Sequence, residues 1–155
     1  MKKRSRIVLP LVAMLTLLGA SCSNDDGGGT GGGSTGGGST GGGGGIGVTL
    51  ADYSVTLDST SLTAGEVTFD VTNDAGQVHE FVVVQTDLAE DALPTDDAGD
   101  VDEESPKISP VDEIEDIEPG THPSLTVALE AGSYVALCNL PGHYRQGMHA
   151  AFEVA

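Results

Sequence analysis

Cys138-Asn-Leu-Pro-Gly-His143-Tyr-Arg-Gln-Gly-Met148 places three potential metal ligands within eleven residues. A thiolate, an imidazole and a thioether follow one another at the spacing Cys-x4-His-x4-Met. Soft sulfur combined with imidazole is the donor set that selects copper. A mononuclear blue-copper centre needs a second imidazole beside the first, and it uses the Met as a weak axial ligand. The stretch therefore predicts that a second His comes from elsewhere in the fold.

His79 is the candidate for that second imidazole. It ends the turn-forming segment Asn73-Asp-Ala-Gly-Gln-Val and directly precedes the β-prone run Glu80-Phe-Val-Val-Val84. A run of this kind predicts a strand, so His79 is expected at the mouth of a strand, on a rigid base. Taken alone, His79 could be a surface residue, Cys138 a buried apolar thiol and Met148 a core side chain.

Together these positions resemble the cupredoxin family over roughly residues 46 to 155. The likeness consists of Asn-x5-His before a valine-rich strand, Tyr-x3-Cys at a strand end, and Cys-x4-His-x4-Met. The loop spacing is most similar to that of rusticyanin-type and sulfocyanin-type members. The resemblance implies a Greek-key β-sandwich that binds one type 1 copper ion through His79, Cys138, His143 and Met148.

Two histidines are left unassigned, and two neighbours of the ligands are expected to support the site. His122 precedes a proline in an expected turn, and His149 follows Met148 directly, so it points the opposite way in an extended strand. Asn139 and Glu80 are candidates to link the two ligand-bearing segments by hydrogen bonds. Many cupredoxins carry Asn where this chain carries Glu80.

Alternating apolar positions predict half-buried strands over residues 46–155. The clearest sets are Tyr53, Val55 and Leu57; Val67, Phe69 and Val71; Leu125, Val127 and Leu129; and Tyr134, Ala136 and Cys138. Phe81–Val84 is continuously apolar, which predicts a strand covered on both faces. About seven strands and no long helix fit a single all-β domain with a Greek-key sandwich.

Residues 87–120 interrupt this alternation. They hold 14 of the 24 acidic residues and four of the seven prolines, with only Lys107 in opposition. We expect this acidic excursion to bury little and to form a long surface loop between the halves of the sandwich. The segment is expected to contain a short helical turn over 111–117. Ile108, Val111, Ile114 and Ile117 recur at three-residue steps, so one side of the segment could lie on the domain. The segment serves either as a face for a partner or as a solvated loop.

The formal charge of −18 is the strongest compositional feature. Without residues 1–21, the 24 acidic residues face only Lys107 and Arg145, which excludes binding to nucleic-acid phosphates. The acidic surface serves either solubility or the steering of a basic redox partner such as a cytochrome. We expect a monomer.

The N-terminal part predicts export and a membrane tether. Residues 1–21 form a basic start followed by the apolar run Ile7–Ala20, as in a signal peptide. Leu18-Gly-Ala-Ser-Cys22 resembles the lipobox of bacterial lipoproteins, although Gly19 stands where Leu is usual. Residues 22–45 are rich in Gly, Ser and Thr and predict a flexible tether. The resemblance implies lipidation of Cys22 and anchoring to the outer face of the cell membrane, in a periplasm or at the cell surface; the alternative is an ordinary cleaved signal.

These features predict an exported blue copper protein that carries single electrons between partners such as a cytochrome or a terminal oxidase. Because Cys22 and Cys138 lie in unrelated parts of the chain, we expect no disulfide, and metal ligation would protect Cys138 from oxidation. Four protein ligands leave no open position for a substrate, so we expect no enzyme activity. The alternatives are a module that delivers copper to another protein, and zinc binding at a Cys-His-His site.

Overall fold

The computed structural model describes residues 45–155. The predicted signal peptide, the predicted lipidation site Cys22 and the predicted tether up to residue 44 lie outside these residues. Within residues 45–155, no helix is long and apolar enough to cross a membrane.

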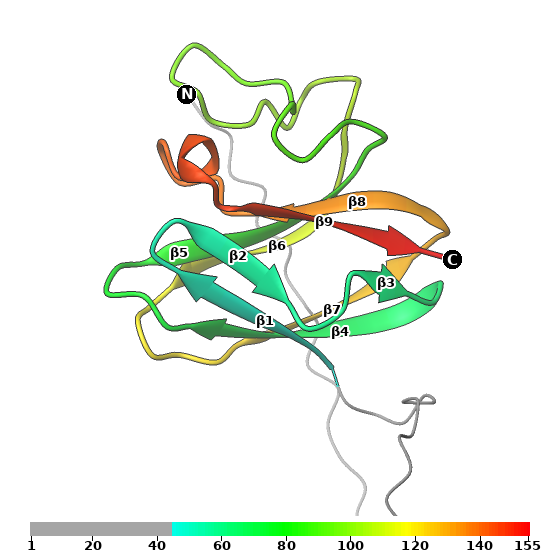
Figure 1. Ribbon diagram of the computed structural model, residues 1–155, viewed down its shortest axis with the longest axis horizontal. Coiled ribbons are helices and arrows are strands. Elements are labelled where there is room, and N and C mark those ends of the chain that lie inside the picture. The colour runs from blue at the N-terminus through cyan, green and yellow to red at the C-terminus, as the bar shows by residue number, and fades with distance from the viewer. Residues whose placement is uncertain (1–44) are drawn as a thin grey trace, which may run out of the picture. The chain divides into compact units, whose positions relative to one another are not determined.

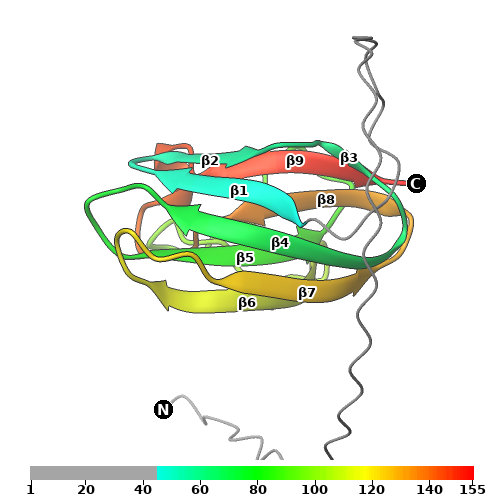
Figure 2. The same ribbon diagram turned by 90° about the horizontal axis from the view of Figure 1, so that it is seen from below.

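Nine strands form two sheets in this part of the chain. Their bounds are β1 Ile46–Ala51, β2 Ser54–Leu57, β3 Ser61–Leu62, β4 Gly65–Asn73, β5 His79–Gln85, β6 Ser109–Ile117, β7 Ser124–Leu129, β8 Gly132–Leu137 and β9 His149–Val154. One sheet has the order β2-β1-β4-β7 and the other β3-β9-β8-β5-β6 (Figures 1 and 2). The chain crosses between the sheets after β2, β3, β4, β6 and β7. The result is the predicted all-β Greek-key sandwich.

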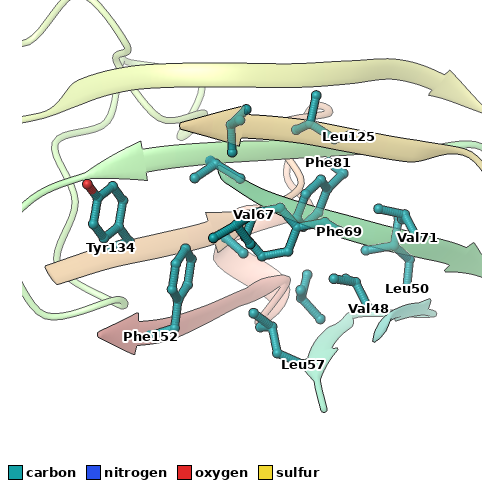
Figure 3. Packing of buried hydrophobic residues seen from close by; sticks show 14 of the residues in the cluster. Val48, Leu50, Leu57, Val67, Phe69, Val71, Phe81, Leu125, Tyr134 and Phe152 are labelled. Atoms are coloured by element: carbon teal, nitrogen blue, oxygen red, sulfur yellow. The ribbon is translucent and has the colours of Figure 1, made fainter. Parts of the chain in front are cut away.

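The main core fills the space between the two sheets. The ring of Phe69 lies 5.4 Å from that of Phe81 and 5.7 Å from that of Phe152. Phe152 stacks on Tyr134 at 5.3 Å (Figure 3). Aliphatic side chains from alternate positions of β1, β2, β4 and β7 surround these rings. The alternation predicted for the strands that contain Phe69 and Val127 is therefore confirmed.

Strand β5 is covered on both faces, as its continuous apolar run predicts. Phe81 and Val83 point into the main core, whereas Val82 and Val84 belong to a second cluster on the outer face of the sheet. β8 behaves in the same way, since Ala136 is in the main core and both its neighbours are in the second cluster. The neighbouring strands β5 and β8 are thus packed on both faces.

The acidic excursion supplies much of the second cluster, so the expectation that it buries little is wrong. Leu93, Val101 and Ile108 are 5%, 5% and 6% exposed. They pack with the outward side chains of β5 and β8. None of the acidic side chains in residues 87–120 is buried. Widely spaced apolar residues therefore cover the sheet, while the acidic residues between them stay at the surface.

Residues 111–117 form most of strand β6, which corrects the predicted helical turn. β6 pairs antiparallel with β5, and the pairing has two register shifts. One shift leaves Val111 unpaired, and the other lies beside Asp116, whose φ is 53°. Each bulge adds a residue between inward positions, so the apolar side chains recur every third residue instead of every second. The three-residue steps from Val111 to Ile117 arise from these two bulges, whereas Ile108 precedes β6 and packs in the second cluster.

Tyr53 also departs from the predicted pattern. It lies in the turn between β1 and β2 with a φ of 66° and is 46% exposed. Val55 and Leu57 are buried as predicted. The strand therefore begins after Tyr53, because the left-handed backbone conformation breaks the alternation at that residue.

The turn that leads into β5 is held by the side chain of Asn73. Its Nδ2 donates to the carbonyl oxygens of Gln77 at 2.9 Å and of Ile117 at 2.8 Å. Its Oδ1 accepts a hydrogen bond from the N–H of Ala75 at 2.9 Å. Asn73 is fully buried, so these bonds are protected from water. They fix the path of the chain immediately before His79.

Replacing Phe69 tests the main core. Phe69→Ala removes the ring that contacts both Phe81 and Phe152, so we expect the free energy of unfolding to fall by about 3–5 kcal/mol. Urea denaturation of the domain measures this loss. Thr56→Ala at an exposed strand position is the control and should change stability by about 0.5 kcal/mol or less. Equal effects of the two variants would contradict the packing described.

Replacing Asn73 tests the turn. Asn73→Asp keeps the shape but puts a carboxylate against two carbonyl oxygens, so we expect a loss of about 2–3 kcal/mol at neutral pH. The loss should shrink in acid, where a protonated carboxyl can donate again. Denaturation at several pH values measures it. Gln77→Ala, which removes only the 3.2 Å contact to Asp52, is the control and should have little effect. A pH-independent loss would argue against this role for Asn73.

Candidate metal centre

The predicted ligands come from segments that one sheet brings together. His79 is the first residue of β5, and Cys138 directly follows β8. The two strands are antiparallel neighbours, with Val82 opposite Leu137. The start of β5 therefore lies beside the end of β8. His79 and Cys138 meet there, although 59 residues separate them in the sequence.

Three donor atoms converge at this end of the sheet. The Sγ of Cys138 lies 3.8 Å from Nδ1 of His79 and 3.4 Å from Nδ1 of His143. The two Nδ1 atoms are 3.3 Å apart. His79 and Cys138 are fully buried, whereas His143 is half-buried. The structure thus brings together three of the four residues predicted as ligands.

The spacing of these atoms fits a single bound metal ion. Protein-bound zinc provides reference bond lengths of about 2.0 Å to nitrogen and about 2.3 Å to sulfur. In a trigonal plane, such bonds separate the nitrogens by about 3.5 Å and each nitrogen from the sulfur by about 3.7 Å. A tetrahedral arrangement gives about 3.3 Å and 3.5 Å. The measured separations agree with both geometries to about 0.3 Å. The types of donor, rather than their spacing, therefore favour copper.

Met148, the fourth predicted ligand, is fully buried and belongs to the main core. Its carbonyl oxygen accepts a hydrogen bond from the N–H of Cys138 at 3.0 Å. Its own N–H donates to the carbonyl oxygen of His143 at 3.2 Å. The backbone therefore holds Met148 beside both of these residues. Its role as an axial ligand stays a prediction.

Two glycines shape the loop between Cys138 and Met148. Gly142 has a φ of 78°, and it precedes His143 and the short 3-10 helix η1 (Tyr144–Gln146). Gly147 ends that helix with a φ of 106°. A Cβ atom at Gly147 would lie 3.3 Å from the carbonyl oxygen of Tyr53. Both bends favour glycine, because other residues rarely adopt these φ angles.

The thiol of Cys138 lies in a dry environment with hydrogen-bond donors. The backbone N–H of Glu80 points to its Sγ at 3.3 Å. Burial raises the pKa of the thiol, and the backbone N–H groups of Leu140 and Glu80 oppose this shift. A cation at the site would reverse the effect of burial, because a metal ion deprotonates a thiol that coordinates it.

His79 lies in an environment that keeps its imidazole neutral. Burial lowers its pKa, and the neighbouring His143 adds to this shift, while Asp52 opposes it. Neutral imidazole is the form that binds a metal ion. The outer nitrogen Nε2 of His79 is buried and has no hydrogen-bond partner in the described part of the chain.

Of the two residues expected to link the ligand segments, only Glu80 does so, and it does so through its backbone. Its side chain lies near Glu113 on β6, and burial together with a hydrogen bond to Glu113 raises the pKa of Glu80 to about 8. Asn139 turns the other way. It bonds the backbone of Val101 and the carboxylate of Glu103, which both belong to the acidic excursion.

The remaining histidines lie outside the cluster, as their sequence positions predict. Nδ1 of His122 bonds the hydroxyl of Thr72 at 3.1 Å. His149 lies against the ring of Tyr144, with Nδ1 3.9 Å from a carboxylate oxygen of Glu90. A second group of potential metal-binding side chains consists of carboxylates alone, from Glu80, Glu103 and Glu113.

Two further residues, which the ligand pattern does not reveal, lie beside the site. Tyr53 approaches His143 edge-on, with ring centroids 6.2 Å apart. Tyr144 carries a buried hydroxyl that bonds the acidic excursion. Neither residue occupies a ligand position, although Tyr144 lies within the ligand stretch, and both sets of contacts join segments that are distant in the sequence. Only the folded structure reveals them.

Comparisons with known proteins extend this picture. No protein-family model and no curated protein matches the chain. Solved structures do match. Auracyanin from Roseiflexus castenholzii is 23% identical with a TM-score of 0.50, and the match covers 70% of this chain and 94% of that one. Auracyanin B is also 23% identical with a TM-score of 0.50, covering 71% and 87%. Rusticyanin is 22% identical with a TM-score of 0.48, covering 70% and 78%.

The two auracyanin matches cover 70% and 71% of this chain, each with a TM-score of 0.50. They agree with the two-sheet topology, and the predicted ligand positions lie together at one end of it. The sandwich of residues 45–155 therefore has the cupredoxin fold.

Proposed function

We propose that residues 46–155 bind one type 1 copper ion and transfer single electrons. His79, Cys138 and His143 would form the plane of the site, and Met148 would be the axial ligand. The observation that carries this proposal is the convergence of a buried thiol and two imidazole nitrogens within 3.8 Å of one another. When bound, copper supplies the one-electron couple between Cu(II) and Cu(I).

The chain itself supplies a rigid frame for the donor atoms. His79 begins β5 and Cys138 directly follows β8, and these two neighbouring strands are covered on both faces. Met148 is tied to Cys138 and His143 through the backbone. Donor atoms that hardly move between oxidation states keep the cost of electron transfer small. This arrangement favours a carrier over a module that must release its metal.

The half-buried His143 is the ligand nearest to solvent, so we place the electron-transfer contact at its edge. Tyr53 lies beside it as the exposed aromatic residue of the described chain. The proposed partners are redox proteins such as a cytochrome or a terminal oxidase. The excess of 24 acidic residues over six basic ones favours a basic partner surface.

Export and anchoring complete the proposal. The lipobox-like Leu18–Cys22 would attach the mature chain to the outer face of the cell membrane, in a periplasm or at the cell surface. The Gly-rich residues 27–45 would let a monomeric domain reach partners at or near that membrane. These segments precede the described domain in the sequence.

The absorption spectrum of the domain loaded with Cu(II) tests the metal site. We expect an intense visible band from charge transfer between the Cys138 thiolate and copper, which Cys138→Ser abolishes and His122→Ala leaves unchanged. Reversible cycling in voltammetry would then support the carrier function. A colourless protein that prefers zinc, or one that quickly loses Cu(I) to a chelator, would contradict the proposal and favour the zinc or delivery alternative.

Salt dependence tests the role of the acidic surface. We expect electron transfer to a basic c-type cytochrome to slow by about tenfold or more between low and physiological ionic strength, because salt screens the attraction. Stopped-flow mixing measures this rate, and an acidic cytochrome is the control, with the opposite trend. Rates that do not depend on salt for either cytochrome would leave solubility as the role of the acidic residues.

A further inference from the structure

We propose that residues 87–108, here called the strap, hold the ligand loop 138–148 in place, with Tyr144 as the main positioning residue. The strap lies over the outer face of the five-stranded sheet, above β5 and β8 (Figure 1). This inference deepens the proposed function, on which it rests only for the identity of the bound metal. Its contacts can be tested without any metal.

The ring of Tyr144 is part of the cluster that joins the strap to the sheet. Tyr144 is 4% exposed and packs in the same apolar cluster as Leu93, Val101 and Ile108 of the strap. The outward side chains of β5 and β8 complete this cluster. The residue directly after His143 is therefore buried beneath the strap. Moving the loop away from the sheet would expose this apolar surface to water.

The hydroxyl of Tyr144 makes two hydrogen bonds to the strap backbone. It accepts from the N–H of Leu93 at 2.9 Å and donates to the carbonyl oxygen of Glu90 at 2.9 Å. Both strap groups belong to irregular backbone, so neither takes part in a strand ladder. A single side chain thus supplies partners that this part of the strap would otherwise lack.

Three further contacts tie the strap to the rest of the loop. Asn139 bonds both backbone groups of Val101, at 2.7 Å and 3.1 Å. The N–H of Gly142 donates to the carboxylate of Asp100 at 2.9 Å. Arg145 reaches the hydroxyl of Thr95 at 3.4 Å. The loop residues that make these contacts lie between the proposed ligands. The strap therefore limits the movement of the loop along most of its length.

The consequence is that the metal site and the strap open together. The sheet fixes His79 and Cys138, whereas His143 lies in a loop whose outer contacts come from the strap. A partner or chelator that removes the metal would need the loop to move, and the strap opposes that movement. The acidic excursion is therefore a structural part of the site rather than only a solvated loop.

Hydrogen exchange in the metal-free full-length chain tests this inference through Tyr144→Phe. This change keeps the ring and removes both hydroxyl bonds. We expect amide exchange to rise by about tenfold in residues 88–105 and 139–147, and to stay unchanged in β1 and β4. Tyr134→Phe is the matched control, because it removes the single 2.9 Å bond to the Glu130 carbonyl elsewhere in the fold. The proposal would be overturned if Tyr144→Phe raised exchange in these segments no more than Tyr134→Phe does.

A second pair of variants covers the case in which Tyr144→Phe fails to fold. Asp100→Ala removes the bond to Gly142, and Asp97→Ala removes an equal charge from an exposed position of the strap. We expect Asp100→Ala alone to speed exchange in the loop several-fold. In the copper-loaded chain, it should also speed the loss of Cu(I) to a chelator by a similar factor.

The two readouts separate the strap from the proposed function. A chain that binds no copper, but in which Asp100→Ala and Tyr144→Phe loosen the loop selectively, would contradict the function and support the strap. A chain that binds copper, but in which Asp100→Ala and Asp97→Ala show equal exchange, would support the function and contradict the strap. An increase spread over both sheets in Tyr144→Phe and Asp100→Ala would show a general loss of stability and overturn the positioning role.

Discussion

The pairing of β5 with β8 is the constraint on which the rest of the structure depends. It places the first residue of one strand beside the residue that ends the other, so His79 meets Cys138 without help from a flexible segment. The N–H of Glu80 donates to Sγ of Cys138 across the same junction. If this register moved by one residue, inward and outward side chains would exchange faces, and both apolar clusters would be lost together with the site.

Burial of these two strands on both faces gives the site its electrostatic character. In water, a thiol and two imidazoles would titrate nearly independently. In the sandwich, burial disfavours both the thiolate of Cys138 and the imidazolium of His79. Without a metal, Cys138 and His79 therefore favour their neutral forms. Such a site gains most from a soft cation, which replaces the missing solvation of the thiolate.

The sequence was sufficient to predict the fold and the residues that meet, but not the packing of the acidic excursion. Apolar residues alternate with other residues along strands such as β4 and β7, and this local pattern can be read directly from the sequence. The ligand positions are a specific signal when all of them are taken together. The bulges of β6 could not be predicted, because they depend on pairing with β5 and mimic a helical period. Leu93, Val101 and Ile108 are isolated among acidic residues, so composition hides their common burial. Asn139 likewise bonds Val101 of the strap, and only the fold brings these two residues together.

The acidic surface and the buried site can be tuned separately, because they lie in different dielectric environments. Exposed carboxylates act through water and salt, so their influence on the centre fades beyond about 8 Å at physiological ionic strength. Cys138 is fully buried, so charges close to it are screened far less. At the proposed copper site, exclusion of water from the thiolate and the N–H of Glu80 would therefore set most of the preference between oxidation states. Surface charge can then vary with the partner while the buried donors remain unchanged.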